Sequence, residues 1–438
     1  MSITCKFGGT SLATSVNVRA ACEIVRADEK RRLVVVSAPG KKNSDGKKVT
    51  DLLHACHAGR FDETLFNACF SMIADTFREI ATIAPSFPIE EELDLIRSQI
   101  KFSESNIDFV ASRGEYLNAK LIAAYLGYEF LDASKFIRFQ DGELDLARTL
   151  SLAKTLDQTK RYVIPGFYGM DEKGHIKTFS RGGSDVTGAI VARAFGCELY
   201  ENWTDVDGIR VSDPRIVENS KKVEQVSFRE LREMSYMGAS VLHAETLLPL
   251  YEAPIPIVLK NSFRPELGGT RILKKRTEKS RGETITCITG KSDYTCIQIS
   301  KAMLDKQLGF VKKATAVFEE YHINISHTHS GLDNLCFFVE RSEYKSISFG
   351  EFVKELSSRI DADKIKAHEK IALLAVIGHD LSGRVGILAK IFNTLHSEGI
   401  SVKTVYQSIS ECNIIIGVEE EKLTQCVKAL YRELIEEG

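Results

Sequence analysis

Short β-branched runs alternate with amphipathic stretches along the chain from Ile3 to about Pro256. The runs with strand character are ITCKF, RLVVVS, YEFLD, RYVIPGF, ELYENWTDV and PIPIVL, and helical patterns cover residues 17–27, 50–56, 113–126 and 185–195. This alternation is typical of a parallel sheet, because the chain returns through a helix before it starts each new strand. We therefore predict an α/β fold with a mainly parallel sheet sandwiched by helices.

A helix-rich insert at residues 61–105 interrupts the alternation. Pro85 and Pro88 lie inside it, and proline breaks a helix because it lacks the main-chain donor. We expect the helical structure to break there. The sequence does not tell what the insert does.

The pattern changes after a polar, glycine-bearing stretch at residues 263–283, which is typical of a linker. Beyond it, the order strand, helix, strand, strand, helix occurs twice, which predicts two βαββαβ, ferredoxin-like modules. We place the domains at residues 1–283, 284–370 and 371–438.

The duplicated module offers no candidate nucleophile or metal site, which favours a sensor or dimerisation unit. Because exposed sheet edges are usually paired, we expect a homodimer or a dimer of dimers through these modules.

Charge and hydropathy exclude several classes of protein. Lysine and arginine (58) nearly balance aspartate and glutamate (60), so the chain presents no overall field for nucleic acid or an anionic membrane. The longest apolar runs, LVVVSA and IALLAVI, are only strand-length, and the first residues do not resemble a secretion signal. The ten cysteines are scattered without CxxC pairs. We expect a cytoplasmic protein with reduced, mostly buried thiols, no metal ligands, and no membrane or nucleic-acid partner.

Two glycine pairs, in KFGGTS at residues 6–11 and SRGGSD at residues 180–185, each follow a strand-like run and open a helix-like one. Main-chain N–H groups in such a turn can surround an anion. Lys6 adds a mobile cation to the first loop, and Arg181 adds a bidentate clamp to the second. Together they suggest a phosphoryl-transfer site, although no GxxxxGK[ST] motif is present and the chain is not a P-loop protein.

Glycine pairs alone are weak evidence, because a tight strand-to-helix turn also needs glycine. The neighbouring residues favour a ligand: Lys6 precedes one pair, and Arg181, Ser184 and Asp185 surround the other. All are expected at the carboxyl ends of strands, where open α/β sheets bind ligands.

The segment SRGEYLNAK places Glu115 near the start of a predicted helix. A capping box between Ser112 and Glu115 is one complete interpretation. The other pairs Glu115 with Arg181, because a carboxylate for an ammonium group and a guanidinium for a carboxylate suit an amino acid. Ser37 and Thr50 are candidate neutral donors for the same ligand.

Between these two donors, the lysine-rich GKKNSDGKK predicts a solvated loop, which we favour over a phosphate-covering lid. Further on, NWTDVDGIRVSDPR contains two Asp-rich turns after a strand. They serve either as ordinary turns or as a nucleotide site, in which Thr204, Asp205, Arg210 and Arg215 hold ribose and polyphosphate.

The motifs KFGGTS, SRGEYLNAKL, FSRGGSDVTGAIVARAFG, WTDVDGIRVSDPR, SVLHAETLLPL and GGTRI occur in the order seen in aspartokinases. On these motifs the chain resembles that family, which has the amino-acid kinase fold, and the tail modules resemble ACT domains. The resemblance covers nearly the whole chain. It implies ATP-dependent phosphorylation of L-aspartate to 4-phospho-L-aspartate, with Mg²⁺ on the nucleotide and no protein ligand for the metal. This reaction is the first step towards lysine, threonine and methionine.

The resemblance also implies roles for individual residues. Lys6 would lie against the transferred phosphoryl group, and Asp185 would organise Lys6. The remaining roles fall into three groups: phosphate binding by Gly8, Gly9 and Thr10; aspartate binding by Thr50, Glu115, Arg181 and Ser184; and nucleotide binding by Thr204, Asp205, Arg210 and Arg215.

The chain departs from the family at two positions. Arg210 stands where the family often has Tyr, and His327 stands where lysine-inhibited members commonly have Asp. An amino-acid effector is expected at the ACT modules, with lysine the first candidate and threonine the second. Two other functions stay open: a non-catalytic amino-acid sensor, and a kinase of another small acid such as glutamate or a nucleoside monophosphate.

Overall fold

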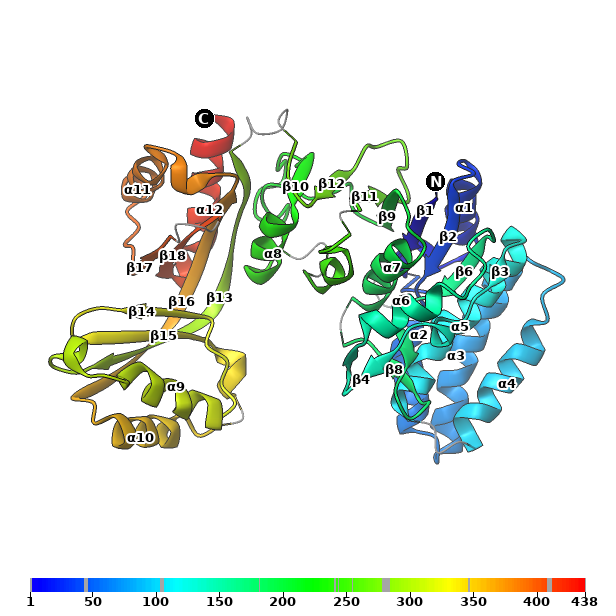
Figure 1. The fold of residues 1–438 in the computed structure, drawn as a ribbon, viewed down its shortest axis with the longest axis horizontal. Coiled ribbons are helices and arrows are strands. Elements are labelled where there is room, and N and C mark those ends of the chain that lie inside the picture. Colours follow the sequence, from blue (N-terminus) through cyan, green and yellow to red (C-terminus); the bar gives the residue numbers. More distant parts are fainter. Residues whose placement is uncertain are drawn as a thin grey trace. The chain divides into compact units, whose positions relative to one another are not determined.

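The computed structural model describes residues 2–42, 46–102, 106–180, 182–239, 242, 244–253, 255–277, 284–345, 347–407 and 412–437. Its chain divides into two compact units (Figure 1). The N-terminal unit comprises Met1–Ile209, Lys222–Ser235 and Ser240–Arg281. The C-terminal unit comprises Arg210–Lys221, Tyr236–Ala239 and Gly282–Gly438.

An eight-stranded sheet forms the centre of the N-terminal unit. Its strands, in spatial order, are β10 (Gln225–Ser227), β12 (Thr270–Leu273), β11 (Ile257–Asn261), β9 (Leu199–Thr204), β1 (Ile3–Phe7), β2 (Arg31–Val36), β6 (Tyr162–Pro165) and β3 (Glu129–Phe130). All neighbouring pairs are parallel except β11 with β12. The predicted mainly parallel sheet is therefore confirmed.

Eight α-helices begin in the described part of the N-terminal unit: α1 (Ser15–Arg26), α2 (Val49–Ala58), α3 (Glu63–Ala81), α4 (Ile89–Phe102), α5 (Ile107–Leu126), α6 (Leu146–Ala153), α7 (Gly183–Ala194) and α8 (Phe228–Tyr236). Short 3-10 helices lie at Thr10–Leu12, Ala133–Lys135 and Ala244–Leu250. Two small hairpins pair β4 (Phe139–Gln140) with β5 (Glu143–Leu144), and β7 (Tyr168–Met170) with β8 (Ile176–Thr178).

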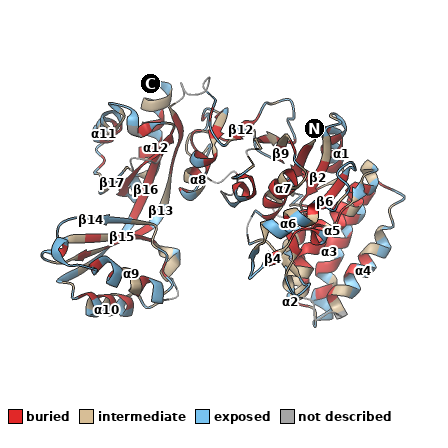
Figure 2. Ribbon diagram, viewed as in Figure 1, coloured by how far each residue is buried: buried red, intermediate tan, exposed pale blue. Residues whose placement is uncertain are grey.

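Helices cover both faces of the main sheet. Side chains alternate along a strand, so Cys5 and Phe7 of β1 lie on one face, where they join a buried cluster with α1 and α5. Lys6 lies on the other face, where α7 packs against β1, β2 and β9. Figure 2 shows the central strands buried, as expected for a sheet covered on both sides.

The helix-rich insert is confirmed and breaks where the prolines predict. Helix α3 ends at Ala81 and α4 begins at Ile89, with Pro85 and Pro88 between them. Helices α2, α3, α4 and α5 share a second apolar core, so the insert forms a helical layer of its own.

One local prediction was wrong. Helix α5 begins at Ile107, and Asn106 caps it by accepting a 2.8 Å hydrogen bond from Phe109 N. Glu115 therefore lies in the middle of the helix. Ser112 Oγ donates to Phe109 O at 2.7 Å, so Ser112 and Glu115 do not form a capping box.

The C-terminal unit contains a six-stranded antiparallel sheet. Its strands, in spatial order, are β14 (His327–Ser330), β15 (Asn334–Glu340), β13 (Ile285–Ser300), β16 (Lys364–Gly378), β18 (Asn413–Glu419) and β17 (Thr404–Tyr406). Its helices are α9 (Phe310–Glu320), α10 (Phe349–Ile360), α11 (Ile387–Ser397) and α12 (Leu423–Tyr431). Short helical turns lie at Leu304–Lys306, Arg341–Tyr344, Leu381–Gly383, Glu420–Lys422 and Arg432–Glu436.

The long strands β13 and β16 run through both repeats. The second half of β13, from Tyr294, pairs with β15 and with the first half of β16. The first half of β13, from Ile285, pairs with the second half of β16, which in turn pairs with β18. The chain of one repeat is thus inserted between two strands of the other.

A segment distant in sequence also belongs to the C-terminal unit. Residues 210–221 follow β9 and form a loop in which Val211 N donates to Lys221 O at 2.9 Å. Ile288 N of β13 donates to Val211 O at 2.6 Å, and Tyr431 Oη accepts from Lys221 N at 2.7 Å. Through these contacts the loop packs with the repeats rather than with the main sheet.

Nine of the ten cysteines are buried, and Cys336 is partly exposed. This confirms the expectation of mostly buried thiols. Among the residues described, no helix combines the length and the apolar character that crossing a membrane requires.

Candidate active site

Two loops at the carboxyl ends of β1 and β2 meet through their glycines. Gly40 N donates to Gly9 O at 2.8 Å, and Ser37 N donates to Phe7 O at 3.2 Å. Gly8 N donates to Trp203 O at 3.1 Å, so this amide is not open to a ligand. Part of the predicted anion cradle is therefore used to join the strands.

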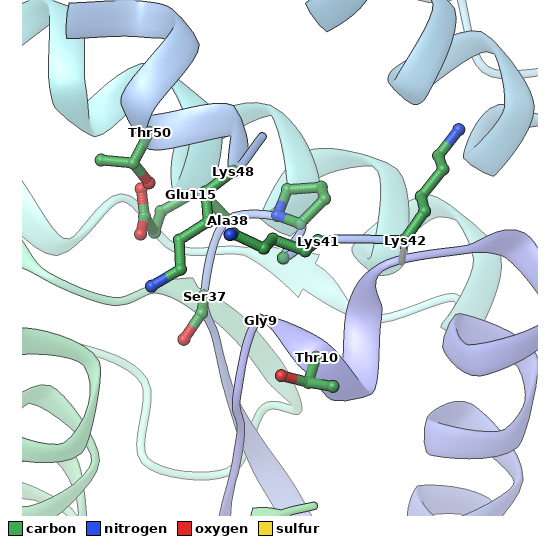
Figure 3. A pocket seen from close by; sticks show the side chains of 11 residues that line it. Gly9, Thr10, Ser37, Ala38, Lys41, Lys42, Lys48, Thr50 and Glu115 are labelled. Carbon is green, nitrogen blue, oxygen red and sulfur yellow. The ribbon is translucent and has the colours of Figure 1, made fainter. Parts of the chain in front are cut away.

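A pocket of about 550 Å³ opens beside these loops (Figure 3). It is lined by Gly9, Thr10, Ser37, Ala38, Pro39, Gly40, Lys41, Lys42, Lys48, Thr50 and Glu115. In Figure 3 the side chains of Lys48, Thr50 and Glu115 lie on one side of the pocket, and Lys42 points away from it. The Lys42 ammonium instead lies 3.7 Å from the carboxylate of Glu79.

Glu115 presents a buried carboxylate to this pocket. The residue is only 5% exposed, and its Oε2 has no hydrogen-bond partner within the described chain. Burial raises the pKa of Glu115 to about 8, although the main-chain N–H of Ala38 and the charge of Arg113 lower it in part. A cationic ligand would stabilise the Oε2 oxygen of Glu115, which is buried without a donor.

Lysines that we assigned to a solvated loop also line the pocket. Lys41 and Lys48 are exposed, and neither forms an ion pair with another described residue. The pocket therefore offers cations and one buried carboxyl group, which suits a ligand that carries carboxylates and an ammonium group.

Lys6 and Asp185 form an ion pair beside the pocket. Lys6 Nζ lies 2.6 Å from Asp185 Oδ1, with the two side chains 9% and 19% exposed. A Cβ on Gly8 would lie 3.5 Å from Lys6 Nζ, so the ammonium lies against the glycine loop. The structure thus brings together the cation and carboxylate that the sequence singled out, 179 residues apart.

The second glycine pair opens α7. Gly182 adopts φ 56°, a conformation that favours glycine, and a Cβ on Gly183 would lie 2.7 Å from the ring of Phe167. Ser184 packs against Gly166, where a Cβ would lie 2.6 Å from Ser184 Oγ. Arg181 lies outside the described residues.

The candidate nucleotide residues fall into two groups. Thr204 ends β9, and its hydroxyl donates to Asp205 Oδ1 at 3.1 Å. Asp205 is exposed at this strand end, close to Asn261, whose amide donates to Asp207 Oδ1 at 2.7 Å. These residues all belong to the N-terminal unit.

Arg210 and Arg215, by contrast, belong to the C-terminal unit. Arg210 donates to Ser220 O at 2.6 Å, and the exposed Arg215 pairs with Asp213 at 2.6 Å. Both guanidinium groups therefore have partners within their own loop.

The structure gathers Gly9, Thr10, Ser37, Thr50 and Glu115 around one pocket, with Lys6, Gly8, Ser184 and Asp185 outside its lining. Sequence reasoning missed Gly40, and it placed less weight on Lys41 and Lys48. The SAPGKK run that directly follows strand β2 was the available signal for these residues.

Comparison with known proteins identifies the family of the chain. Residues 1–261 match the model of the amino acid kinase family, and residues 374–434 match that of the ACT domain. Aspartokinase 3 of Bacillus subtilis is 32% identical to the chain over 98% of its length and 97% of the relative. The chain belongs to the aspartokinases.

Two solved aspartokinase structures are similar to nearly the whole chain. The crystal structure of Clostridium acetobutylicum aspartate kinase is 36% identical, with a TM-score of 0.88 and coverage of 99% of both chains. Escherichia coli aspartokinase III in complex with aspartate and ADP is 26% identical, with a TM-score of 0.79 over 99% of this chain and 100% of that one. The prediction of an aspartokinase with ACT modules is confirmed.

Proposed function

We propose that this chain transfers the γ-phosphoryl group of ATP to the side-chain carboxylate of L-aspartate, forming 4-phospho-L-aspartate. The observation that carries the proposal is the buried carboxyl group of Glu115, whose Oε2 has no hydrogen-bond partner among the described residues, in a pocket that lysines also line. The Escherichia coli relative in complex with aspartate and ADP supports both substrates.

The pocket accounts for recognition of the acceptor. The ammonium group of aspartate would pair with Glu115, and the hydroxyls of Ser37 and Thr50 would donate to a carboxylate. Arg181 and Ser184 are proposed to hold the second carboxylate, since a guanidinium provides two parallel donors. The reacting carboxylate is already ionised at neutral pH, because its reference pKa is about 4, so attack on phosphorus needs no general base.

Charge neutralisation by the chain then favours the transfer. Lys6 would lie against the transferred group, and the amides of Gly9 and Thr10 would donate to phosphate oxygens, because Gly8 N is already bonded to Trp203 O. Asp185 is paired with Lys6 and Glu115 is buried, so Mg²⁺ would be held by phosphates and water. When bound, the ion neutralises charge between the phosphates.

The nucleotide is proposed to lie at the strand end formed by Thr204 and Asp205, across the glycine loop from the acceptor pocket. Arg210 and Arg215 stay predictions from the sequence, and each guanidinium is bonded within its own loop, to Ser220 O and to Asp213 respectively.

An ATP-dependent hydroxamate assay with aspartate, glutamate and other small acids tests this function, because hydroxylamine traps an acyl phosphate directly. We expect product with aspartate only. Product with a different acid would make the chain another carboxylate kinase. Binding of amino acids without product would make it a non-catalytic sensor.

For the C-terminal unit we propose an amino-acid effector site, with lysine as the first candidate and threonine as the second. The ACT match at residues 374–434 supports a regulatory role. A relative from Escherichia coli, 27% identical, is named lysine-sensitive aspartokinase 3. His327, which stands where lysine-inhibited members commonly have Asp, is half-buried, and its ring centroid lies 5.7 Å from that of Tyr236.

We also propose that the chain forms a homodimer or a dimer of dimers through its ACT repeats. Strands β14 and β17 are the outermost strands of the C-terminal sheet, and the side chains of β14 are mostly exposed. Light scattering of the full chain should then give at least twice the monomer mass of 48.8 kDa. A monomer at every concentration tested would overturn this assignment.

A further inference from the structure

A buried amide lies directly behind the Lys6–Asp185 ion pair. Asn202 is 1% exposed and lies within β9 between two other buried residues, Glu201 and Trp203. A buried amide that lacks hydrogen-bond partners lowers stability, because its donors and its acceptor have lost their hydrogen bonds to water. The contacts that Asn202 makes therefore require an explanation.

Those contacts lead to the candidate catalytic carboxylate. Asn202 Nδ2 donates to Asp185 Oδ1 at 2.8 Å, and this is the oxygen that lies 2.6 Å from Lys6 Nζ. Lys6 and Asn202 are direct neighbours in the parallel register of β1 and β9, so both side chains rise from the same face of the sheet. Two donors on adjacent strands thus hold one oxygen.

Tyr200 completes the arrangement from the same strand. Its hydroxyl accepts from Asn202 Nδ2 at 3.2 Å and donates to Asp185 O at 3.1 Å. Burial raises the pKa of Tyr200 well above its usual value, with a further increase from the charge of Asp185, so the phenol keeps its proton and remains a donor. A Cβ on Gly188 would lie 2.5 Å from Tyr200 Oη, so α7 carries glycine where the tyrosine passes beneath it.

From this geometry we propose that Asn202 is a positioning residue for phosphoryl transfer. It fixes the Asp185 carboxylate, and through it the ammonium of Lys6, beside the glycine loop. Tyr200 assists by holding Asn202 and the main chain at the start of α7. The inference rests on the proposed kinase function, because it assigns Lys6 to the transferred phosphoryl group.

The test compares kcat with KM in variants of the full chain. Asn202→Leu keeps the side-chain shape but removes the donor, and we expect kcat to fall about tenfold or more, with the KM for aspartate and for ATP within about twofold. Asn202→Asp should be worse, because it places a second carboxylate against Asp185. Tyr200→Phe should give a smaller loss of kcat.

The matched control is Asn413→Leu. Asn413 is a buried amide on β18 of the C-terminal unit, and its replacement should leave kcat within about twofold.

If the wild-type chain makes no hydroxamate, the proposed kinase function is wrong, whatever the Asn202 variants show. If the wild type is active and Asn202→Leu keeps kcat within about twofold, Asn202 has no positioning role. The same follows if Asn202→Leu changes KM as much as kcat, or if Asn413→Leu loses as much kcat as Asn202→Leu. A crystal structure of Asn202→Leu gives a readout that needs no activity. We expect Asp185 Oδ1 to move away from Lys6 Nζ, and an unchanged ion pair would overturn the inference. If Asn202→Leu does not fold, the structure and kinetics of Tyr200→Phe decide in the same way.

Discussion

Gly9 and Gly40 touch through their backbones: Gly40 N bonds to Gly9 O at 2.8 Å, and a Cβ on Gly40 would lie 2.6 Å from Gly9 C. Backbone cannot move aside as a flexible side chain can, so Gly40→Ala should separate the two loops that line the pocket. We expect lower stability, and a loss of kcat/KM for aspartate of about tenfold or more. Steady-state kinetics and thermal melting measure both effects. Gly268→Ala is the control, because nothing lies within 4 Å of its Cβ position. Equal behaviour of the two variants would contradict this view of the loops.

Lys6→Ala should lower kcat by about 100-fold or more, with much less effect on the KM for aspartate. The reason is that the ammonium acts mainly on charge that develops in the transition state. Steady-state kinetics of the purified variant, with circular dichroism to confirm folding, provide the measurement. Near-normal turnover in a folded Lys6→Ala protein would exclude Lys6 from the mechanism.

Arg181→Lys should raise the KM for aspartate strongly, since an ammonium group cannot form two parallel hydrogen bonds to a carboxylate. This prediction comes from the sequence alone, because Arg181 lies outside the described residues. The KM values for aspartate and ATP should be measured on the same preparation. If only the KM for ATP rises, the loop serves the nucleotide and not the amino acid.

Glu115 should make both substrate binding and stability depend on pH. Its pKa is raised to about 8 from an ordinary value of 4.5, so between these values the folded protein keeps a proton that the unfolded chain has lost. Stability therefore falls as pH rises through this window. The free energy of unfolding of Glu115→Gln should exceed that of the wild type by a margin that grows from about pH 5 to about pH 8.

The same carboxylate must be ionised to bind an ammonium group. We expect the wild-type KM for aspartate to fall as pH rises from about 6 to about 8, and the KM of Glu115→Gln to be higher and nearly independent of pH. Denaturant titrations and kinetics across this range measure the two effects. A pH-independent KM in the wild type would separate Glu115 from the ammonium group of aspartate.

Lysine should weaken the binding of aspartate or ATP, and those substrates should weaken lysine binding by the same factor. Coupling between two sites is reciprocal, and typical values change affinity roughly 5- to 150-fold. Calorimetry of the full chain, with and without substrate, measures the factor for lysine and for threonine. If neither amino acid binds or alters activity, the ACT repeats serve assembly alone.

The sequence predicted the central strands and the helical insert because their signals are local. Strands β1, β2, β6 and β11 are mostly buried and rich in apolar residues. Pro85 and Pro88 mark the break between α3 and α4. Strands β10 and β12 were missed, because they are three and four residues long and lie in polar segments. They exist as strands only through pairing with each other and with β11, which no local pattern reveals.

The candidate site was predictable to a similar extent. Residues that follow strand ends, such as Thr10 and Ser37, could be anticipated from the topology rule for open sheets. The assignment of residues 210–221 to the C-terminal unit depends on Ile288 and Tyr431, which are distant in sequence. The proposed role of Asn202 could not be predicted for another reason: a polar residue in a strand belongs to no motif, and its partner Asp185 comes from α7.

The interleaving of β13 and β16 limits the order in which the chain can fold. Residues 285–291 leave the ribosome before their partners at residues 371–378 exist, and a whole repeat is synthesised in between. That inner repeat, with its own apolar core around Phe318 and Phe337, can fold first and bring the two distant segments together. The outer repeat, which contains the first half of β13, the second half of β16, and β18, should fold later. Its two central strands can pair only after the long chain segment between them has been synthesised. Nascent-chain experiments should therefore find the inner repeat protected from protease before the outer one.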